Sequence, residues 1–260
     1  MSDVKGFGAE VTRTIWLDVD HIIMIYVGSA AEFPLVSENH WLFYTHALPS
    51  APWDRFLDTF TFQQRIFRIP AEQVPGLARE IREIHNRVEW KRGEEEGGEP
   101  RIGNRAFLAV GAMLIDYGIL AREYFLSRAL PPEEKETYYQ DQCQFYRWMG
   151  VSDLPETYVE YAGERKEVVR RDLKPNAYTQ ALFEAYRKEL GAFRMLLLRQ
   201  FMAWFVPKEI SDALGLRKQR WFGPLFFLYP RLHRAGLTRP LRGLLFPKRV
   251  RSRLEALGAN

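Results

Sequence analysis

The sequence contains a single cysteine, Cys143, among its 260 residues. One thiol cannot form a disulfide within the chain, which excludes a disulfide-stapled scaffold and favours a reducing compartment. Because Cys143 lies among aromatic residues, we expect it to be a buried hydrophobic side chain. The sequence also lacks paired-cysteine zinc spacings, glycine-rich phosphate loops and nucleophile elbows, so none of these sites is indicated.

Long uncharged apolar runs are also missing. A membrane-spanning helix needs about 20 apolar residues, and the longest candidates, residues 21–31 and 195–206, are too short or interrupted by Arg199. The first residues have neither the basic start nor the apolar run of a signal peptide. We therefore expect a cytoplasmic protein without a transmembrane helix, either soluble or bound peripherally at a membrane surface.

Acidic residues are scarce near the C-terminus. Residues 217–260 contain eleven Lys or Arg and one acid, Glu255, which gives a net charge of +10. Since the whole chain carries +4, residues 1–216 sum to −6. The basic residues alternate with apolar clusters, which fits short helices on an anionic membrane and equally a packed subdomain with a solvated basic face. No reader motif accompanies the charge, so no nucleic-acid partner is expected.

Helical periodicity dominates the rest of the chain, without a run of alternating strands or an internal repeat. The predicted helices cover residues 53–67, 72–90, 104–129, 133–149, 154–171 and 177–206. Residues 93–103, rich in Gly and Glu, predict a solvated loop. The sequence thus predicts an all-α, single-domain bundle of roughly ten helices. Residues 1–216 form its main part, and residues 217–260 form a basic, apolar C-terminal segment.

Three polar residues share one face of the first predicted helix. Asp58 is three positions after Arg55 and Thr59 is four positions after it, so their side chains are neighbours on a helix. The helix is otherwise rich in phenylalanine, and the three groups would then form a polar notch in an apolar pocket. The plain alternative is a surface charge pair, which is common on helices.

His85 lies on the apolar stripe of the second predicted helix, beside Ile84 and one turn after Ile81. A buried imidazole without a partner costs about 1–3 kcal/mol, so it needs either a backbone carbonyl or a metal. The residue pattern leaves both partners open, although a lone histidine is more often a core residue.

Other histidines and acids give weaker signals. Asp18, Asp20 and His21 predict a helix cap rather than a metal cluster, because such residues commonly begin helices. His40, His46 and His233 have no spacing that indicates a shared metal.

Taken in order, these motifs resemble the catalytic domain of the MpaB/rubber-oxygenase (latex-clearing protein) family. Arg55-x-x-Asp58-Thr59 resembles the family's Arg-x-x-x-Thr motif, and His85 corresponds to its helical haem ligand. The other motifs in family order are Glu32-Phe33-Pro34, Ile102-Gly103-Asn104 and the stretch from Leu130 to Pro155. The resemblance covers about residues 32–160, with a weaker echo at residues 206–216.

The resemblance implies that residues 1–216 form a helical oxygenase-like domain that encloses haem b, with His85 as the proximal ligand of the iron. Arg55 and Thr59 would flank the oxygen site as catalytic and cofactor-binding residues. Arg55 would stabilise negative charge that develops on oxygen, and Thr59 would hydrogen-bond to oxygen or water. Asp58 would orient Arg55 or relay protons. The implied reaction is oxidation of an apolar, isoprenoid- or lipid-like small molecule by O2, including cleavage of a carbon–carbon double bond.

The chain departs from the family pattern at several points, and two alternatives stay open. The rubber-cleaving branch has a lysine before the threonine, and Asp58 in its place argues against a lysine-closed resting state. Residues 113–116 also differ from the aromatic-and-histidine pattern of many members. One alternative is a cofactor-free helical lipid-binding protein in which His85 is structural. The other is a peripheral membrane interaction module in which residues 217–260 carry the function.

Overall fold

The computed structural model describes residues 6–37, 52–96 and 104–258. These ranges contain twelve α-helices and no strand, so the prediction of an all-α fold is confirmed. The α-helices are α1 (Glu10–Leu17), α2 (Val19–Glu32), α4 (Pro52–Arg68), α5 (Val74–Glu96), α6 (Asn104–Leu126), α7 (Pro132–Trp148), α8 (Tyr158–Asp172), α9 (Ala177–Phe205), α10 (Lys208–Ala213), α11 (Gly223–Arg234), α12 (Arg239–Leu245) and α13 (Lys248–Gly258). Short 3-10 turns occupy Phe33–Leu35, Ala71–Gln73 and Arg220–Phe222.

The predicted helices all occur, with boundaries that differ by a few residues. The main difference is the end of α5, which continues to Glu96 instead of ending near residue 90. Residues 93–96 of the expected loop are therefore helical, because glutamate is a good helix former and one glycine costs a helix only about 1 kcal/mol. The rest of that expected loop, residues 97–103, lies outside the described ranges.

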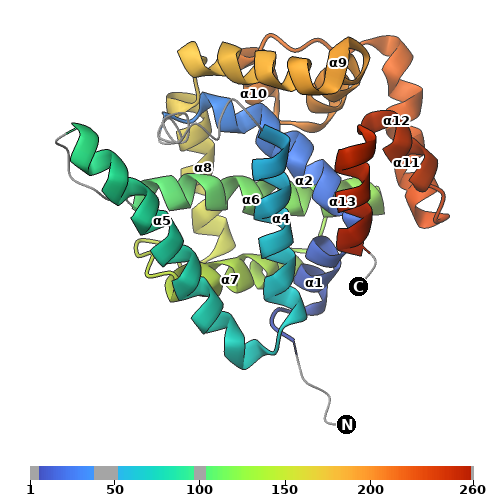
Figure 1. The fold of residues 1–260 in the computed structure, drawn as a ribbon. Helices are drawn as coiled ribbons and strands as arrows, with labels where there is room; N and C mark the ends of the chain where they lie inside the picture. The colour runs from blue at the N-terminus through green and yellow to red at the C-terminus, as the bar shows by residue number, and fades with distance from the viewer. Residues whose placement is uncertain (1–5, 38–51, 97–103, 259–260) are drawn as a thin grey trace.

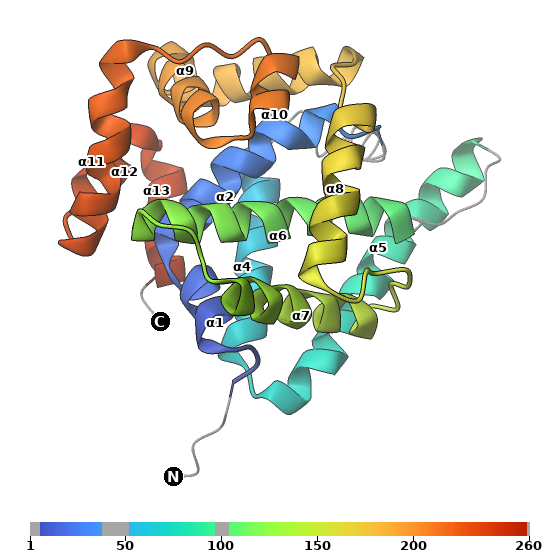
Figure 2. The ribbon, with the colours of Figure 1, turned by 180° about the vertical axis from the view of Figure 1, so that it is seen from behind.

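Helix α6 crosses the middle of the molecule, and α2 packs along it (Figures 1 and 2). The two helices approach closely at Gly28, where an added Cβ would lie 2.1 Å from the ring of Tyr117. Helix α2 begins at Asp18, whose side chain accepts hydrogen bonds from the backbone N–H groups of Asp20 and His21. This contact confirms the predicted cap, and it sets the direction in which α2 enters the core.

Helix α6 is also the one helix in the described ranges that is long and apolar enough to cross a membrane, by length and composition alone. Half of its most apolar window is buried inside the protein. Asp116, near its middle, pairs with Arg165 of α8. A buried core helix also passes this test of length and composition, and α6 packs as a core helix in this structure.

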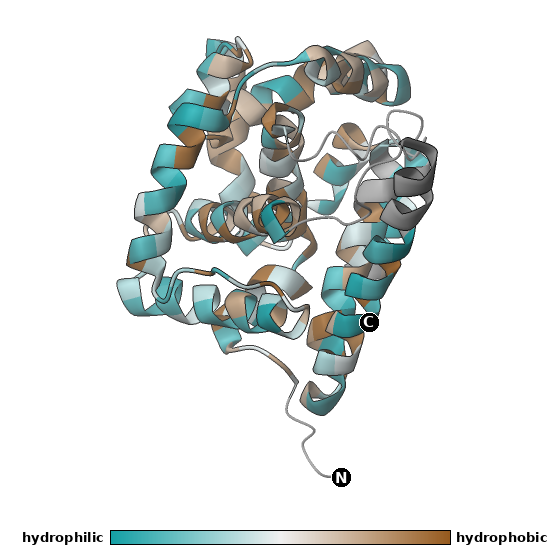
Figure 3. Cartoon of the chain, turned by 90° about the vertical axis from the view of Figure 1, so that its left-hand side faces the viewer, coloured by the Kyte–Doolittle hydropathy of each residue, from teal (hydrophilic) through white to brown (hydrophobic). Residues whose placement is uncertain are grey.

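The core is rich in aromatic side chains. Trp16 of α1 stacks on Phe67 of α4 with ring centroids 6.1 Å apart, and Gln64 donates a hydrogen bond to the carbonyl oxygen of Trp16 at 3.1 Å. Cys143 is fully buried, as expected, and burial raises the pKa of its thiol. Figure 3 shows hydrophobic residues concentrated on the inner helices and hydrophilic residues along the outer ones.

The C-terminal helices pack on this bundle. Phe222 and Tyr229 are fully buried and Phe226 is nearly so, and α11 contacts α6 and α9. Helix α13 lies against α4 and α2. Residues 217–258 are therefore attached to the body by an apolar interface, while many of their basic side chains face solvent.

Candidate active site

A cavity of about 300 Å³ lies between α2, α4, α5, α6, α7 and α9. Its volume falls at the lower end of the range for small-molecule pockets, about 300–1,000 Å³. Aromatic and aliphatic side chains form most of the wall, among them Phe60, Phe62, Ile81, Phe107, Val110, Met113, Leu114, Phe145, Met149 and Leu182. The lining therefore suits an apolar ligand.

His85 of α5 is part of the cavity wall. Its Nδ1 lies 2.8 Å from the backbone carbonyl oxygen of Ile81. A carbonyl can only accept, so in the neutral ring Nδ1 carries the proton and Nε2 keeps the lone pair. The ring of Phe107 meets His85 edge-on, with centroids 5.2 Å apart. These contacts set the tautomer and limit ring rotation, as the second-shell partners of metal-binding histidines do.

Thr59 and Asp58 of α4 line the same cavity, Thr59 half-buried and Asp58 exposed. The Asp58 carboxylate accepts a hydrogen bond at 2.5 Å from Arg253 of α13. Asp54, one turn earlier, accepts from the same guanidinium at 3.1 Å. Asp58 therefore links the cavity edge to the C-terminal segment, a contact that no sequence pattern predicted.

The structure thus brings Asp58, Thr59 and His85 to one cavity. Arg55, the fourth predicted site residue, belongs to α4, but its side chain lies outside the described part of the chain. His40 and His46 also lie outside it.

Two motifs that carry the family resemblance meet at Asn104, the first residue of α6. Its amide nitrogen donates to the Ser152 hydroxyl at 2.9 Å, and Ser152 belongs to the motif that ends at Pro155. Its amide oxygen accepts from Arg82 at 3.4 Å, and Arg82 lies one turn before His85 on α5. The motifs are therefore close in space as well as ordered along the chain.

Two further polar residues of the cavity were missed in the sequence. Gln63 is buried on α4, and its spacing of four residues from Thr59 is a signal that places both on one helix face. Ser29 of α2 is buried, and its hydroxyl has no hydrogen-bond partner in the described part of the chain. Ser29 gave no signal, because only the packing of α2 against other helices turns it toward the cavity.

A buried charge network supports the end of α2 beside the cavity. Arg165 of α8 pairs with Glu32, and its Nε donates to Asp116 at 2.7 Å. The hydroxyl of Tyr117 donates to Glu32 at 2.9 Å, and that of Tyr161 donates to Asp116 at 2.7 Å. Burial raises the pKa of the Glu32 carboxyl, although its contacts with Arg165 and Tyr117 oppose the rise. The network holds Glu32, and with it the Glu32-Phe33-Pro34 motif, in place.

Comparison with known proteins adds one finding. The family model described as ER-bound oxygenase mpaB/B'/Rubber oxygenase, catalytic domain, matches residues 22–235. The chain belongs to this family. No curated protein and no solved structure matches it. The predicted MpaB/rubber-oxygenase resemblance is therefore confirmed over a longer region than its motifs covered, and the chain is a member of an oxygenase family.

The described cavity of this MpaB/rubber-oxygenase member fits a haem in two respects. A flat apolar macrocycle needs apolar walls, and the lining provides them. A haem iron needs a ligand such as an imidazole nitrogen, and in the tautomer that the Ile81 carbonyl sets, Nε2 of His85 carries the lone pair that could serve as one. Thr59 adds a hydroxyl that can donate or accept a hydrogen bond at the same cavity.

Proposed function

We propose that this protein is a haem b-dependent oxygenase that uses O2 to oxidise an apolar, isoprenoid- or lipid-like substrate. Oxidative cleavage of a carbon–carbon double bond is the reaction to test first. The proposal depends above all on His85, which stands in an apolar cavity wall with its tautomer set by Ile81. Membership of an oxygenase family supports the reaction class, whereas the haem and the substrate are our inference.

In this proposal His85 would hold the iron through Nε2, while the Ile81 carbonyl keeps the Nδ1 proton engaged and makes the ring more basic. Haem, when bound, supplies an iron centre that activates O2. The apolar walls would exclude water from the cavity. Exclusion of water lowers the local dielectric constant, which strengthens each hydrogen bond made inside.

The residues of α4 would act on the oxygen side. The Thr59 hydroxyl would donate a hydrogen bond to oxygen or hold a water molecule. Arg55, by family resemblance, would stabilise negative charge that develops on oxygen. The Asp58 carboxylate, in contact with Arg253, would orient Arg55 or accept and release a proton.

The direct test is the haem content of protein expressed with sufficient haem supply. We expect roughly one haem per chain for the wild type, as in single-haem proteins with one proximal histidine. His85→Ala should lose tight haem binding and keep its helix content, because alanine is a good helix former. Arg79→Ala, at an exposed position of the same helix, is the matched control and should keep the haem spectrum.

Two outcomes would reject parts of this proposal. A colourless but well-folded wild type would favour a cofactor-free lipid-binding protein, and binding of a fluorescent fatty acid would then be measured. A wild-type iron spectrum in His85→Ala would show that another residue ligates the iron.

We also propose that residues 217–260 hold the enzyme at an anionic membrane surface, from which an apolar substrate would enter. Large apolar side chains remain exposed on this segment, namely Trp221 (55%), Phe227 (58%), Leu228 (43%), Leu237 (59%) and Leu244 (43%). Exposed basic side chains stand among them, namely Arg217, Lys218, Arg220, Arg231, Arg234 and Arg239. Exposed apolar groups beside positive charge are typical of interfacial helices, and the description of the family as ER-bound agrees with this location.

A further inference from the structure

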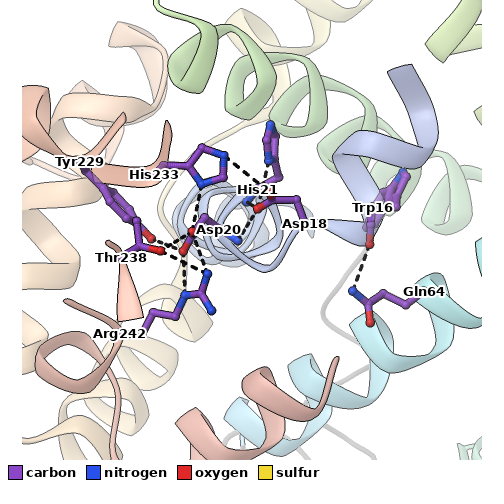
Figure 4. A network of polar contacts seen from close by, with 9 residues as sticks. All are labelled: Trp16, Asp18, Asp20, His21, Gln64, Tyr229, His233, Thr238 and Arg242. Carbon is purple, nitrogen blue, oxygen red and sulfur yellow. Dashed lines mark hydrogen bonds and ion pairs between the residues drawn. The ribbon is translucent and has the colours of Figure 1, made fainter. Parts of the chain in front are cut away.

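A second cluster of histidine and carboxylate side chains lies away from the cavity, where the start of α2 meets α11 (Figure 4). It consists of Asp18, His21 and His233, and one ligand atom from each lies within 4.8 Å of the others. None of the three residues lines the active-site cavity. Any role of this cluster is therefore separate from the proposed haem site.

His21 is the residue of this cluster whose ring nitrogens lack hydrogen-bond partners in the described structure. It is fully buried, and neither of its ring nitrogens makes a hydrogen bond of acceptable geometry in the described structure. Its Nδ1 lies 3.3 Å from Asp18 Oδ1, but that oxygen already accepts the backbone N–H groups that cap α2. A buried polar group without a partner costs about 1–3 kcal/mol, so the ring needs a further ligand.

His233 is arranged as metal-binding histidines commonly are. Its Nε2 faces Asp18 Oδ2 at 3.4 Å, and its Nδ1 lies 3.0 Å from Asp20 Oδ2. Donation of the second ring N–H to a carboxylate orients an imidazole and makes it a better ligand. Asp20 is itself held by Arg242, Thr238 and Tyr229 at 2.7–2.9 Å. His233 thus has a rigid outer partner on one side and Asp18 on the other.

We propose that Asp18, His21 and His233 bind a divalent transition-metal ion of the zinc class. Zinc bonds to histidine and carboxylate are about 2.0–2.1 Å long, which places neighbouring ligand atoms of a tetrahedral site about 3.3 Å apart. His21 Nδ1 lies 3.3 Å from Asp18 Oδ1 and His233 Nε2 lies 3.4 Å from Asp18 Oδ2, so each histidine nitrogen is at that spacing from one of the two carboxylate oxygens. The three side chains would leave the fourth position for water.

The surroundings favour a small cation over other ligands. Asp20 is paired with Arg242, but among the described residues no lysine or arginine lies within ion-pair distance of Asp18. The ring of Phe125 packs on both imidazoles, with centroid distances of 4.8 Å to His21 and 4.3 Å to His233. The charge of Arg122 acts on His21 and opposes a cation there, but the carboxylate of Asp18 beside an apolar wall attracts a cation that can shed its water.

Protonation of His233 is the alternative to a metal ion, because it would also place a positive charge beside the Asp18 carboxylate. Burial alone would lower the pKa of His233, but its hydrogen bond to Asp20 and the charge of Asp18 raise it on balance. A proton at that position still leaves the buried ring of His21 without a hydrogen bond. A metal ion would displace the proton and use a nitrogen from each ring, so it accounts for both histidines.

The consequence would be structural. A metal ion at this point would join the first turn of α2 to the last turn of α11, residues that are separated by more than 200 positions in the chain. It would therefore fasten the C-terminal segment to the body.

The test uses the full-length protein, purified without a histidine tag and stripped by a chelator. Titration with Co²⁺ should give one equivalent of a visible ligand-field band, and Zn²⁺ should abolish that band and raise the thermal midpoint. His233→Gln should lose the band. Asp18→Asn keeps a good cap residue for α2. It should weaken Co²⁺ binding by about 100-fold or more, because it removes a direct ligand and the loss of an outer partner already costs about 10–100-fold in metal affinity.

His85→Ala is the matched control, because it removes a histidine from the other site. It should leave Co²⁺ binding unchanged, while His233→Gln should leave the haem spectrum unchanged. The proposal is overturned if folded wild-type protein shows no Co²⁺ band, or if His233→Gln and Asp18→Asn bind Co²⁺ as the wild type does. The cluster would then be a buried polar contact that holds α11 to α2 without a metal.

Discussion

The two histidine regions of this protein differ in what surrounds the imidazole. His85 lies in an apolar wall and is held by a carbonyl one turn earlier on its own helix. His21 and His233 face Asp18, with Asp20 behind it, and come from opposite ends of the chain. An apolar wall with one nitrogen ligand suits the iron of a flat macrocycle, whereas two nitrogens and a carboxylate suit a bare divalent ion. The setting, and not the residue type, therefore separates the two sites.

The regions also differ in how they contribute to stability. The hydrogen bond of His85 is local to α5, and its imidazole also meets the ring of Phe107 on α6, so its removal costs few contacts between helices. The contacts of Asp20 join α2 to α11 and α12 through a buried carboxylate, whose pKa the hydrogen bonds of His233 and Arg242 lower against the effect of burial. We therefore expect mutation of Asp20 mainly to lower the free energy of unfolding. Mutation of His85 should mainly weaken ligand binding.

The largest expected effect is the loss of Asp20. Asp20→Ala would leave Arg242 and three other donors without their shared acceptor. Breaking a buried ion pair by removing one partner costs roughly 3–5 kcal/mol, and we expect that decrease in the free energy of unfolding by urea denaturation. His85→Ala should cost about 1–2 kcal/mol, the value of one hydrogen bond and one ring contact. If both variants lost the same free energy of unfolding, the two histidine regions would not differ in their contribution to stability.

The next effect concerns the outer face of the C-terminal segment. Arg231→Gln with Arg234→Gln should weaken binding to anionic vesicles at low salt by about 2 kcal/mol, since each basic residue near the surface contributes about 1 kcal/mol. That is roughly 30-fold in affinity, and flotation at several lipid concentrations would measure it. Arg79→Gln with Arg87→Gln, exposed on α5, is the charge-matched control. Equal binding to anionic and neutral vesicles would count against the electrostatic attraction.

A smaller effect should sharpen the assignment of the haem cavity. Thr59→Val keeps the shape of the side chain and removes its hydroxyl, so we expect O2-dependent turnover to fall about tenfold, or roughly 1.4 kcal/mol in activation free energy. Haem content should not change. Thr61→Val is the control, because the Thr61 hydroxyl donates to the carbonyl of Leu57 within the helix. If both variants turn over at the wild-type rate, Thr59 has no part in the reaction.

The smallest effect is expected where the C-terminal segment meets α4. Arg253→Gln removes the ion pairs with Asp54 and Asp58, which are partly exposed. Exposed pairs typically contribute 1 kcal/mol or less, so the free energy of unfolding should fall by about that amount. Arg251→Gln, on the same helix, provides the comparison. A loss as large as that of Asp20→Ala would show that α13 is as important to the fold as the buried carboxylate.

The sequence by itself determined the local part of this protein. Helical periodicity predicted the all-α fold, and caps and prolines predicted most helix ends within a few residues. The spacing from Thr59 to Gln63 and from Ile81 to His85 also follows from one helical turn. The motif order predicted the oxygenase family, and the match to residues 22–235 confirmed it. These features depend on residues that are near one another in the chain.

Only the tertiary structure decided which distant residues meet. Asp18, Asp20 and His21 were predicted to form a helix cap, and Asp18 does cap α2, but the contact of Asp18 and His21 with His233 had no signal in the sequence. Glu32 and Arg165 are likewise 133 positions apart. A periodic pattern specifies which face of a helix is buried, but it does not specify the helix that covers that face. The partner is set by side-chain packing over the whole core, here by contacts such as Tyr117 against Gly28.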